Sequence, residues 1–301
     1  MIISETGNAD DCVIDCEGDF GFWFEEGTAV IKGITMINAN SGALQVWPGW
    51  VVLRVRDCVF SDCLGPGGGF NICSSGEVRI TDCEFLSNVG GAVYLVCGQG
   101  FLQMWIDSCT FCGNTANYGA AIDCSMHDMI VSITNSVFCH NSAEISGGAI
   151  AFWDQGCPDI GRCTFFSNSA PGGSAIAGWC SGGCSRCIIA YGEGDCPIDV
   201  DDPWGDFSVS CSDIYGNEGG DWVGVIADDL GQDGNFSACP SFCNYEMEPY
   251  DLHLCSGSPC LPGNHPDGVS CGLIGALGQG CDCGPSGTEP TTWGAIKAMY
   301  R

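Results

Sequence analysis

One motif recurs about every 25 residues along most of this chain. In each copy an aliphatic residue stands five positions before a phenylalanine, with a polar bend residue and usually a cysteine between them, as in Ile80-Thr-Asp-Cys-Glu-Phe85. The copies span residues 55–60, 80–85, 106–111, 133–138 and 160–165, and apolar residues extend the series to Ile14, Met36, Ile189 and Ile214. A fixed period of this size is typical of a solenoid, in which each repeat packs only on its neighbours.

Each repeat is predicted to consist of short strands and turns. Its apolar residues alternate with polar ones over a few positions and are then interrupted by Asn, Gly and Ser, whereas a helical repeat would show a 3.6-residue rhythm. Cys83 and Phe85 have the same parity and are expected to point inward, while Glu84 points outward. Stacking of equivalent coils then predicts an interior column of phenylalanines: Phe60, Phe85, Phe111, Phe138 and Phe165.

Polar residues and glycines mark the corners of each coil. Asp82 stands where a bend must interrupt the alternation, and the pair Gly90-Gly91 precedes the next strand. Asp tolerates the left-handed backbone of such bends, and glycine adopts it readily. Asparagine recurs three residues after four of these phenylalanines, from Phe85 to Phe165, and stacked amides can hydrogen bond along a column. The predicted asparagine ladder comprises Asn88, Asn114, Asn141 and Asn168.

These motifs resemble those of right-handed parallel β-helix repeat proteins, many of them secreted or surface proteins of bacteria, over roughly residues 12–222. Segments such as Ser258-Pro-Cys-Leu261 resemble the closing region of such domains. Period and resemblance together predict an all-β fold, a single-stranded right-handed parallel β-helix of about nine to ten coils with an irregular, disulfide-rich C-terminal cap. We expect coils over residues 1–222, closing coils and cap over 223–283, a linker over 284–290 and a tail over 291–301.

The charge of the chain excludes one class of partner. Eight Lys plus Arg stand against 37 Asp plus Glu, a formal net charge of −29. Such a field repels phosphate backbones, so we expect no nucleic-acid binding. The sequence has no uninterrupted apolar stretch of the roughly 18 residues that a membrane span requires, so we expect none.

The 25 cysteines favour an extracellular or cell-surface location, and their odd number leaves at least one unpaired within a monomer. Cysteines stacked one per coil, such as Cys58 and Cys83, are expected to remain buried thiols, because parallel side chains hold their Cβ atoms about 4.8 Å apart, wider than a disulfide requires. The irregular segments are expected to hold disulfides, namely Cys12 with Cys16, Cys239 with Cys243, Cys255 with Cys260, and Cys271 with Cys281 or Cys283.

Both ends of the chain depart from the repeat. The first ten residues lack the basic region and apolar run of a secretory signal, and a coil begins at Val13. Two explanations are open: a leader and first coils are missing from this sequence, or the first coil meets another subunit, which would favour end-to-end stacking. The tail at 291–301 resembles short tails that serve export or surface attachment, and a segment docked on the domain or on a neighbour is the alternative.

Acidic loops and outward tryptophans are the candidate ligand sites. The candidate calcium ligands are Asp199, Asp201, Asp202 and Asp206, because calcium prefers oxygen ligands from flexible loops, although solvated turns explain the same residues. Trp153 and Trp179 should point outward on adjacent coils, and Trp105 also points outward. Flat aromatic rings can stack on sugar rings or on a partner's surface, with loop packing as the alternative.

Three functions of different classes remain open. The first is an extracellular or surface protein with a structural or adhesive role and no catalytic residue, since the carboxylates recur in strand and bend positions rather than as an isolated pair. The second is a carbohydrate-active enzyme, a polysaccharide lyase or glycoside hydrolase, or a glycan-binding module. The third is a subunit of a filament formed by end-to-end stacking. The expected partners are therefore glycans or further copies of the chain.

Overall fold

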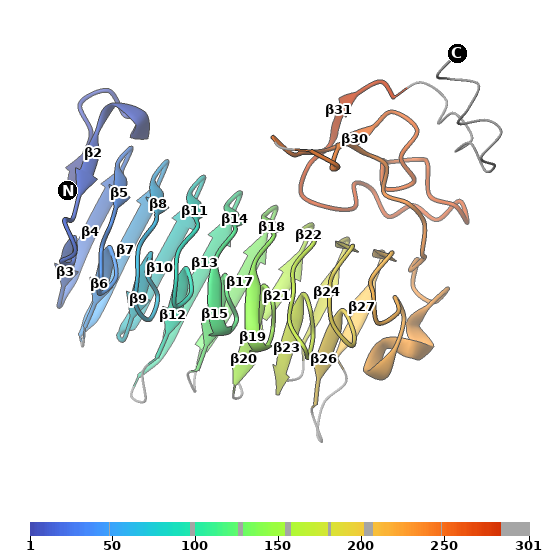
Figure 1. Cartoon of the computed structure of the whole chain (residues 1–301), viewed down its shortest axis with the longest axis horizontal. Coiled ribbons are helices and arrows are strands. Elements are labelled where there is room, and N and C mark those ends of the chain that lie inside the picture. Colours follow the sequence, from blue (N-terminus) through green and yellow to red (C-terminus); the bar gives the residue numbers. More distant parts are fainter. Residues whose placement is uncertain are drawn as a thin grey trace, which may run out of the picture.

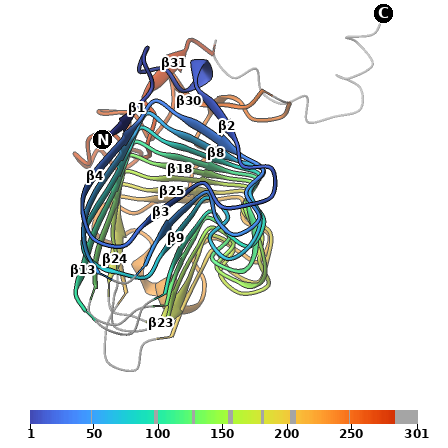
Figure 2. The same cartoon turned by 90° about the vertical axis from the view of Figure 1, so that its left-hand side faces the viewer.

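The computed structural model describes residues 1–47, 49–96, 100–125, 129–153, 158–179, 182–201, 207–247 and 249–283. Over these residues the chain forms a parallel β-solenoid of about ten turns, which confirms the fold class predicted from the repeat. The strands run across the long axis of the molecule in Figure 1, and end-on they enclose a core of roughly triangular outline (Figure 2). The predicted linker and tail lie outside the described residues.

Three long parallel sheets form the solenoid within the described ranges. Sheet A has nine strands: β1 (Ile2–Ile3), β4 (Gly27–Lys32), β7 (Trp50–Arg56), β10 (Ser75–Thr81), β13 (Leu102–Asp107), β17 (Met129–Thr134), β21 (Pro158–Gly161), β24 (Gly183–Ser185) and β27 (Ser208–Ser210). Sheet B has nine: β2 (Val13–Asp15), β5 (Thr35–Ile37), β8 (Val59–Ser61), β11 (Glu84–Leu86), β14 (Thr110–Cys112), β18 (Val137–Cys139), β22 (Thr164–Phe166), β25 (Ile188–Ala190) and β28 (Asp213–Tyr215). Sheet C has eight: β3 (Phe22–Phe24), β6 (Leu44–Val46), β9 (Phe70–Ile72), β12 (Val93–Leu95), β16 (Ile122–Cys124), β20 (Ile150–Trp153), β23 (Ile176–Trp179) and β26 (Ile198–Val200).

Smaller elements complete the described fold. The parallel pair β15 (Thr115–Tyr118) and β19 (Ser142–Ser146) lies between sheets B and C, and a three-stranded sheet near the C-terminus contains β29 (Phe242–Asn244), β30 (Asp251–Cys255) and β31 (Gln279–Cys281). Two short 3-10 helices, η1 (Ala9–Asp11) and η2 (Gly224–Asp229), are neither long nor apolar enough to cross a membrane. The last coils contact η2, where Ile226 is fully buried against the core.

In-register pairing stacks the phenylalanines on top of one another. Phe85 pairs with Phe60 on one side and with Phe111 on the other. From Phe60 to Phe165 successive ring centroids are 5.0, 4.7, 5.0 and 4.8 Å apart, and the rings are at most 1% exposed. Large apolar rings at this spacing exclude water along the whole column.

The corners between sheets A and B use left-handed backbone at equivalent positions. Asp82, Ser108, Asn135 and Arg162 all have φ between 51° and 55°. Non-glycine residues rarely adopt this conformation, and Asn and Asp tolerate it best. Because the same bend recurs at equivalent positions of successive coils, the strands that follow it stay aligned, and equivalent side chains can stack in columns.

The asparagine side chains at the next corner are buried and bonded to one another. The Nδ2 atoms of Asn88, Asn114 and Asn141 each donate to Oδ1 of the next asparagine along the column at 2.9, 2.9 and 3.0 Å, ending on Asn168. The same Oδ1 atoms accept backbone N–H groups, as Oδ1 of Asn114 does from Asn88 at 3.0 Å. Each amide thus replaces backbone partners that the turn cannot supply.

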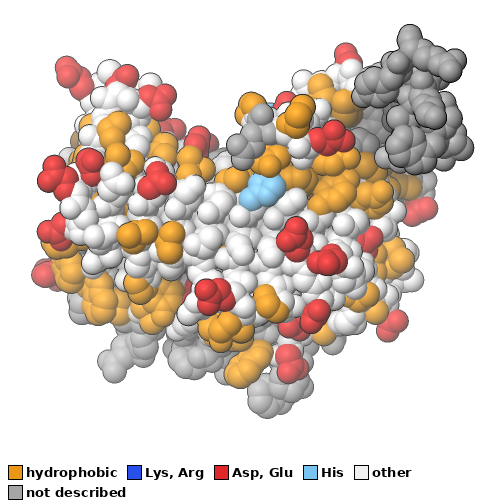
Figure 3. Space-filling view, in the orientation of Figure 1, with side chains coloured by type: hydrophobic (Ala, Val, Ile, Leu, Met, Phe, Trp, Pro, Cys, Tyr) orange, Lys and Arg blue, Asp and Glu red, His pale blue; other side chains and the backbone are white. Residues whose placement is uncertain are grey.

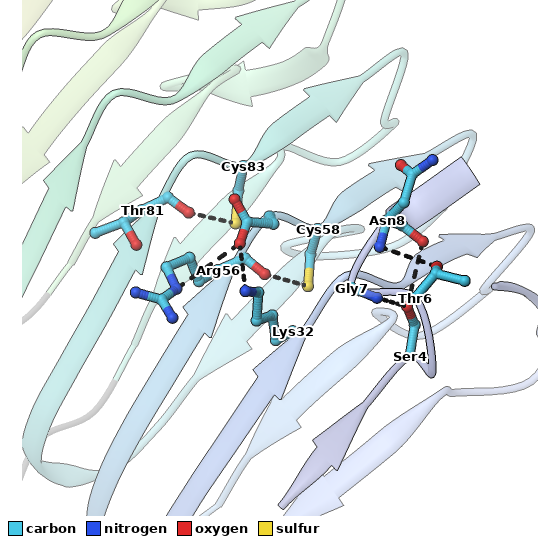
Figure 4. Close-up of polar contacts among 10 residues, drawn as sticks. Ser4, Thr6, Gly7, Asn8, Lys32, Arg56, Cys58, Thr81 and Cys83 are labelled. Atoms are coloured by element: carbon cyan, nitrogen blue, oxygen red, sulfur yellow. Dashed lines mark hydrogen bonds and ion pairs between the residues drawn. The ribbon is translucent and has the colours of Figure 1, made fainter. Parts of the chain in front are cut away.

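The cysteines at the A–B corner are buried free thiols, as the parity argument predicts. Cys58 and Cys83 donate from Sγ to the carbonyls of Arg56 and Thr81, each at 3.2 Å (Figure 4). Burial raises the pKa of the Cys83 thiol well above its ordinary value. These thiols behave as small apolar groups of the core.

The disulfide pairings expected from the sequence are wrong. Cys12, Cys16, Cys239 and Cys260 are free, and Cys260 instead donates to Oδ2 of Asp213 at 3.3 Å. The disulfides found among the described residues include Cys112–Cys139, Cys211–Cys271, Cys243–Cys281 and Cys255–Cys283. Cysteines close in sequence were expected to pair, but strand pairing brings cysteines together that lie far apart along the chain. In sheet B it places Cys112 opposite Cys139, and in the C-terminal lobe it gathers the cysteines of β29, β30 and β31.

The C-terminal lobe, residues 236–283, packs on the outer face of sheet B over the later coils (Figure 1). The ring of Phe166 on β22 lies 5.7 Å from that of Phe242 on β29. Gly275 donates to the Arg186 carbonyl at 2.8 Å, so the chain returns to coils that precede the lobe. Outward positions of sheet B are apolar where the lobe covers them, as at Ile188 and Ala190.

Candidate functional site

A groove lies between the outer face of sheet C and the small strand pair β15–β19. Its volume is about 680 Å³. Tyr94 on β12 and Asp123 on β16, which pair in register, belong to the sheet, and Tyr118 and Glu144 come from β15 and β19. Further residues contribute to the lining, namely Gly65, Pro66, Val89, Gly90, Thr115, Ala116, Asn117 and Ser142. We call this cavity the sheet C groove.

The protruding wall of the groove forms because the turns between sheets B and C are long enough to make strands of their own. Figure 2 shows these turns bulging from the triangular outline beside β9. Thr115 pairs with Ser142, and Ala116 pairs with Ala143. Ala120, Ala143 and Ala170 form a small buried cluster inside the bulge. These small side chains let the turns of successive coils pack closely. The larger Tyr118 side chain lines the groove instead.

Asp123 is the carboxyl of the groove with the most altered electrostatics. Burial raises its pKa to about 7, and the bond it accepts from Ser125 Oγ at 3.3 Å offsets this only in part. Burial also raises the pKa of Tyr94, with a further contribution from the Asp123 charge. A carboxyl that holds its proton near neutral pH can donate it as a general acid. Glu144, in the same groove, is exposed.

An aromatic cluster borders the groove. The ring of Tyr118 lies 5.0 Å from Trp153, and Trp153 lies 6.0 Å from Trp179. Trp153 and Trp179 pair in register on adjacent coils, and Trp179 is 62% exposed. The two indoles meet edge to face at 80°, so they present a stepped surface rather than one flat platform.

Trp105 lies apart from this cluster. It belongs to β13 in sheet A, and the Arg79 guanidinium lies 4.2 Å from its ring centroid. This cation–π contact occupies one face of the half-buried indole. The three tryptophans singled out in the sequence therefore do not form one surface.

Sequence reasoning missed a second aromatic pair beside sheet C, formed by Trp23 on β3 and Trp47 directly after β6. Trp23 and Trp47 stack with ring centroids 6.3 Å apart and an interplanar angle of 14°. Trp23 begins a register of outward residues that continues through Gln45, Asn71, Tyr94, Asp123, Ala151, Ala177 and Asp199. The sequence signal for this column is the second residue of each sheet C strand, and it can be recognised once those strands are aligned.

The predicted calcium ligands are only partly described. Asp199 ends the outward column of sheet C, and Asp201 follows that strand; both side chains are exposed. Asp202 and Asp206 lie outside the described residues. Within the described part of the chain, neither Asp199 nor Asp201 belongs to a group of three or more closely spaced ligand atoms, so calcium binding here stays a prediction.

Two basic residues of the early coils share one carboxylate. Asp57 Oδ2 lies 3.5 Å from Lys32 Nζ and 3.8 Å from Arg56 Nε, and all three side chains are about one-third exposed or more (Figure 4). Surface pairs of this kind contribute little stability, about 0–1 kcal/mol. Asp57 is the shared ion-pair partner of both cations. Figure 3 shows scattered carboxylates and no Lys or Arg on the face it presents.

Comparison with known proteins gives one local match. Residues 108–125 match the Chlamydia polymorphic membrane protein (Chlamydia_PMP) repeat. The matched stretch contains Phe111 and Asn114 of the columns and Tyr118 and Asp123 of the groove. Neither the curated proteins nor the solved structures contain a significant match. The repeat match and the β-solenoid fit a surface β-helix protein.

Proposed function

We propose that this chain is an extracellular or cell-surface β-helix protein with an adhesive role, and that it binds glycans through the sheet C groove. The observation that carries this proposal is the meeting of a cavity of about 680 Å³ with the aromatic cluster Tyr118, Trp153 and Trp179. Aromatic faces bind the apolar faces of sugar rings, and hydroxyl and amide groups such as those of Thr115 and Asn117 bind their hydroxyls.

The charge of the groove narrows the class of glycan. Its lining contains the carboxyls of Asp123 and Glu144 and no Lys or Arg. A chain of net charge −29 repels polyanions, particularly at low ionic strength. Neutral or amino-sugar glycans are therefore favoured over uronic-acid polymers. The match to a membrane-protein repeat supports surface display.

The test replaces the two sheet C tryptophans together. A glycan array first identifies neutral glycans that the wild-type chain binds. Trp153→Ala with Trp179→Ala is expected to weaken binding of these glycans by about tenfold or more, because a loss of about 1.4 kcal/mol in ring contacts corresponds to that factor. Trp105→Ala, on sheet A, is the matched control and should bind normally. Unchanged glycan binding by the double variant, with a normal circular dichroism spectrum, would contradict the proposal. A sizing column run on the same samples tests self-association.

Glycoside hydrolysis is the second candidate function, and the raised pKa of Asp123 favours it. A glycosidase needs one protonated and one ionised carboxyl beside the scissile bond. Asp123 would be the acid, and Glu144 is the other carboxyl that lines the groove. Incubation with the glycans that bind on the array distinguishes the two functions. New reducing ends that the wild-type chain produces and that Asp123→Asn does not produce indicate an enzyme, and intact glycans indicate a binding protein.

A further inference from the structure

Four cysteines of the C-terminal lobe bring their sulfur atoms together. Cys243 lies on β29, Cys255 and Cys281 end β30 and β31, and Cys283 follows two residues later. All four Sγ atoms lie within 4.8 Å of one another. In the structure they form the disulfides Cys243–Cys281 and Cys255–Cys283. We call these residues the four-cysteine cluster.

The sulfurs of different disulfides are spaced like the ligands of one metal ion. Cys281 Sγ lies 3.8 Å from Cys255 Sγ and 3.3 Å from Cys283 Sγ. A tetrahedral zinc ion with Zn–S bonds of about 2.3 Å holds its sulfurs about 3.8 Å apart. Once the two S–S bonds are broken, side-chain rotation can bring the remaining pairs to the same separation.

The backbone around the cluster is fixed independently of the sulfurs. Cys255 N–H donates to the Ser241 carbonyl at 2.8 Å, and Ser256 N–H donates to the Cys281 carbonyl at 3.0 Å. These bonds tie β30 to both of its neighbours. Cys281 and Cys283 are two residues apart, and their sulfur atoms lie on the same side of the chain, 3.3 Å from each other. Reduction therefore leaves four thiols that are already gathered by strand pairing.

We propose that, when its two disulfides are reduced, the four-cysteine cluster binds one zinc ion as a closed tetrathiolate site. A phosphine reduces the two disulfides to four thiols, and two phosphines become phosphine oxides with oxygen taken from water. One Zn²⁺ then replaces the four thiol protons, which pass to the buffer. Four thiolates are a ligand set of structural zinc sites.

The test uses the full chain, reduced with a phosphine in the absence of oxygen, with Co²⁺ as the spectroscopic probe. We expect one equivalent of Co²⁺ to bind with the strong visible bands and sulfur charge-transfer bands of a tetrahedral tetrathiolate, and Zn²⁺ to displace it. Cys281→Ser with Cys283→Ser should lose this equivalent. Cys211→Ser with Cys271→Ser removes the two thiols that reduction releases from the disulfide between the lobe and the coils, and this variant should retain the equivalent.

A second measurement keeps the outcome clear if the cluster variant fails to fold. Alkylation of the reduced wild-type chain, followed by mass spectrometry, reads each cysteine separately. Zinc should slow alkylation of the four clustered cysteines by about tenfold or more, because bound thiolates are poor nucleophiles, and should leave Cys239 unaffected. Absence of the tetrathiolate bands, their persistence in the cluster variant, or alkylation of the four cysteines at an unchanged rate would overturn the proposal.

Discussion

The asparagine column gives the sharpest stability prediction, and Asn114→Ala is the perturbation. The Asn114 side chain is fully buried, and its Oδ1 accepts both the backbone N–H and the side-chain Nδ2–H of Asn88, at 3.0 and 2.9 Å. Its own Nδ2 donates to the Phe85 carbonyl at 3.0 Å and to Asn141 Oδ1 at 2.9 Å. Alanine removes all four bonds without adding bulk.

The expected loss follows from the groups left without partners. Two donors of Asn88 lose their acceptor in a dry corner, and each unsatisfied buried donor costs about 1–3 kcal/mol. Asn141 Oδ1 keeps the bond from the Asn114 backbone at 3.1 Å, so it adds little. The free energy of unfolding should therefore fall by about 2–6 kcal/mol, a large share of the usual stability of a domain.

Urea denaturation followed by circular dichroism measures this loss, and Asn71→Ala is the matched control. Asn71 lies on the outer face of sheet C, and its Oδ1 has no hydrogen-bond partner among the described residues. Its replacement should cost less than about 1 kcal/mol. Hydrogen exchange should show the extra opening in the coils on either side of Asn114, because a solenoid couples mainly nearest neighbours. A loss no larger than that of Asn71→Ala would refute the reasoning.

Two further predictions concern the C-terminal half. Burial raises the pKa of Asp213 to about 7, above its unfolded value near 4, so the folded state binds the extra proton and its stability should fall as pH rises through this window. Asp213→Asn should reduce the fall in urea midpoint between about pH 4 and pH 7, and an equal fall in both proteins would contradict the assignment. Cys211→Ser with Cys271→Ser opens a loop with a sequence separation of 60, which should lower the free energy of unfolding by about 4 kcal/mol. An unchanged urea midpoint and unchanged proteolysis of the lobe would contradict this estimate.

The fold could be predicted because one period fixes many contacts at once. A repeat of about 25 residues places Phe85 between Phe60 and Phe111 whatever the details of the turns, and the structure has this register. Parity also gave the buried state of Cys58 and Cys83, since alternation in a strand decides which side a residue faces.

The site could not be predicted in the same way, because it depends on how non-repeating parts fold. The sheet C groove needs the β15–β19 bulge, and nothing in the period indicates that Tyr118 and Asp123 line one cavity. The angle between Trp153 and Trp179 follows from side-chain rotamers, which spacing does not determine. The predicted disulfide pairings were wrong for a related reason, because the pairing of β29, β30 and β31 decides which cysteines of the lobe lie close together.

The return of the chain to earlier coils gives the molecule a mechanical polarity. The hydrogen bonds between coils run along the long axis. Tension along this axis would therefore separate the coils one after another, starting from an end. At the C-terminal side the lobe reaches back to Arg186 and is tied to Cys211. Peeling from that side must therefore break several coils and a covalent bond together, whereas the first described coils, in which Cys12, Cys16, Cys58 and Cys63 are free, can yield one at a time.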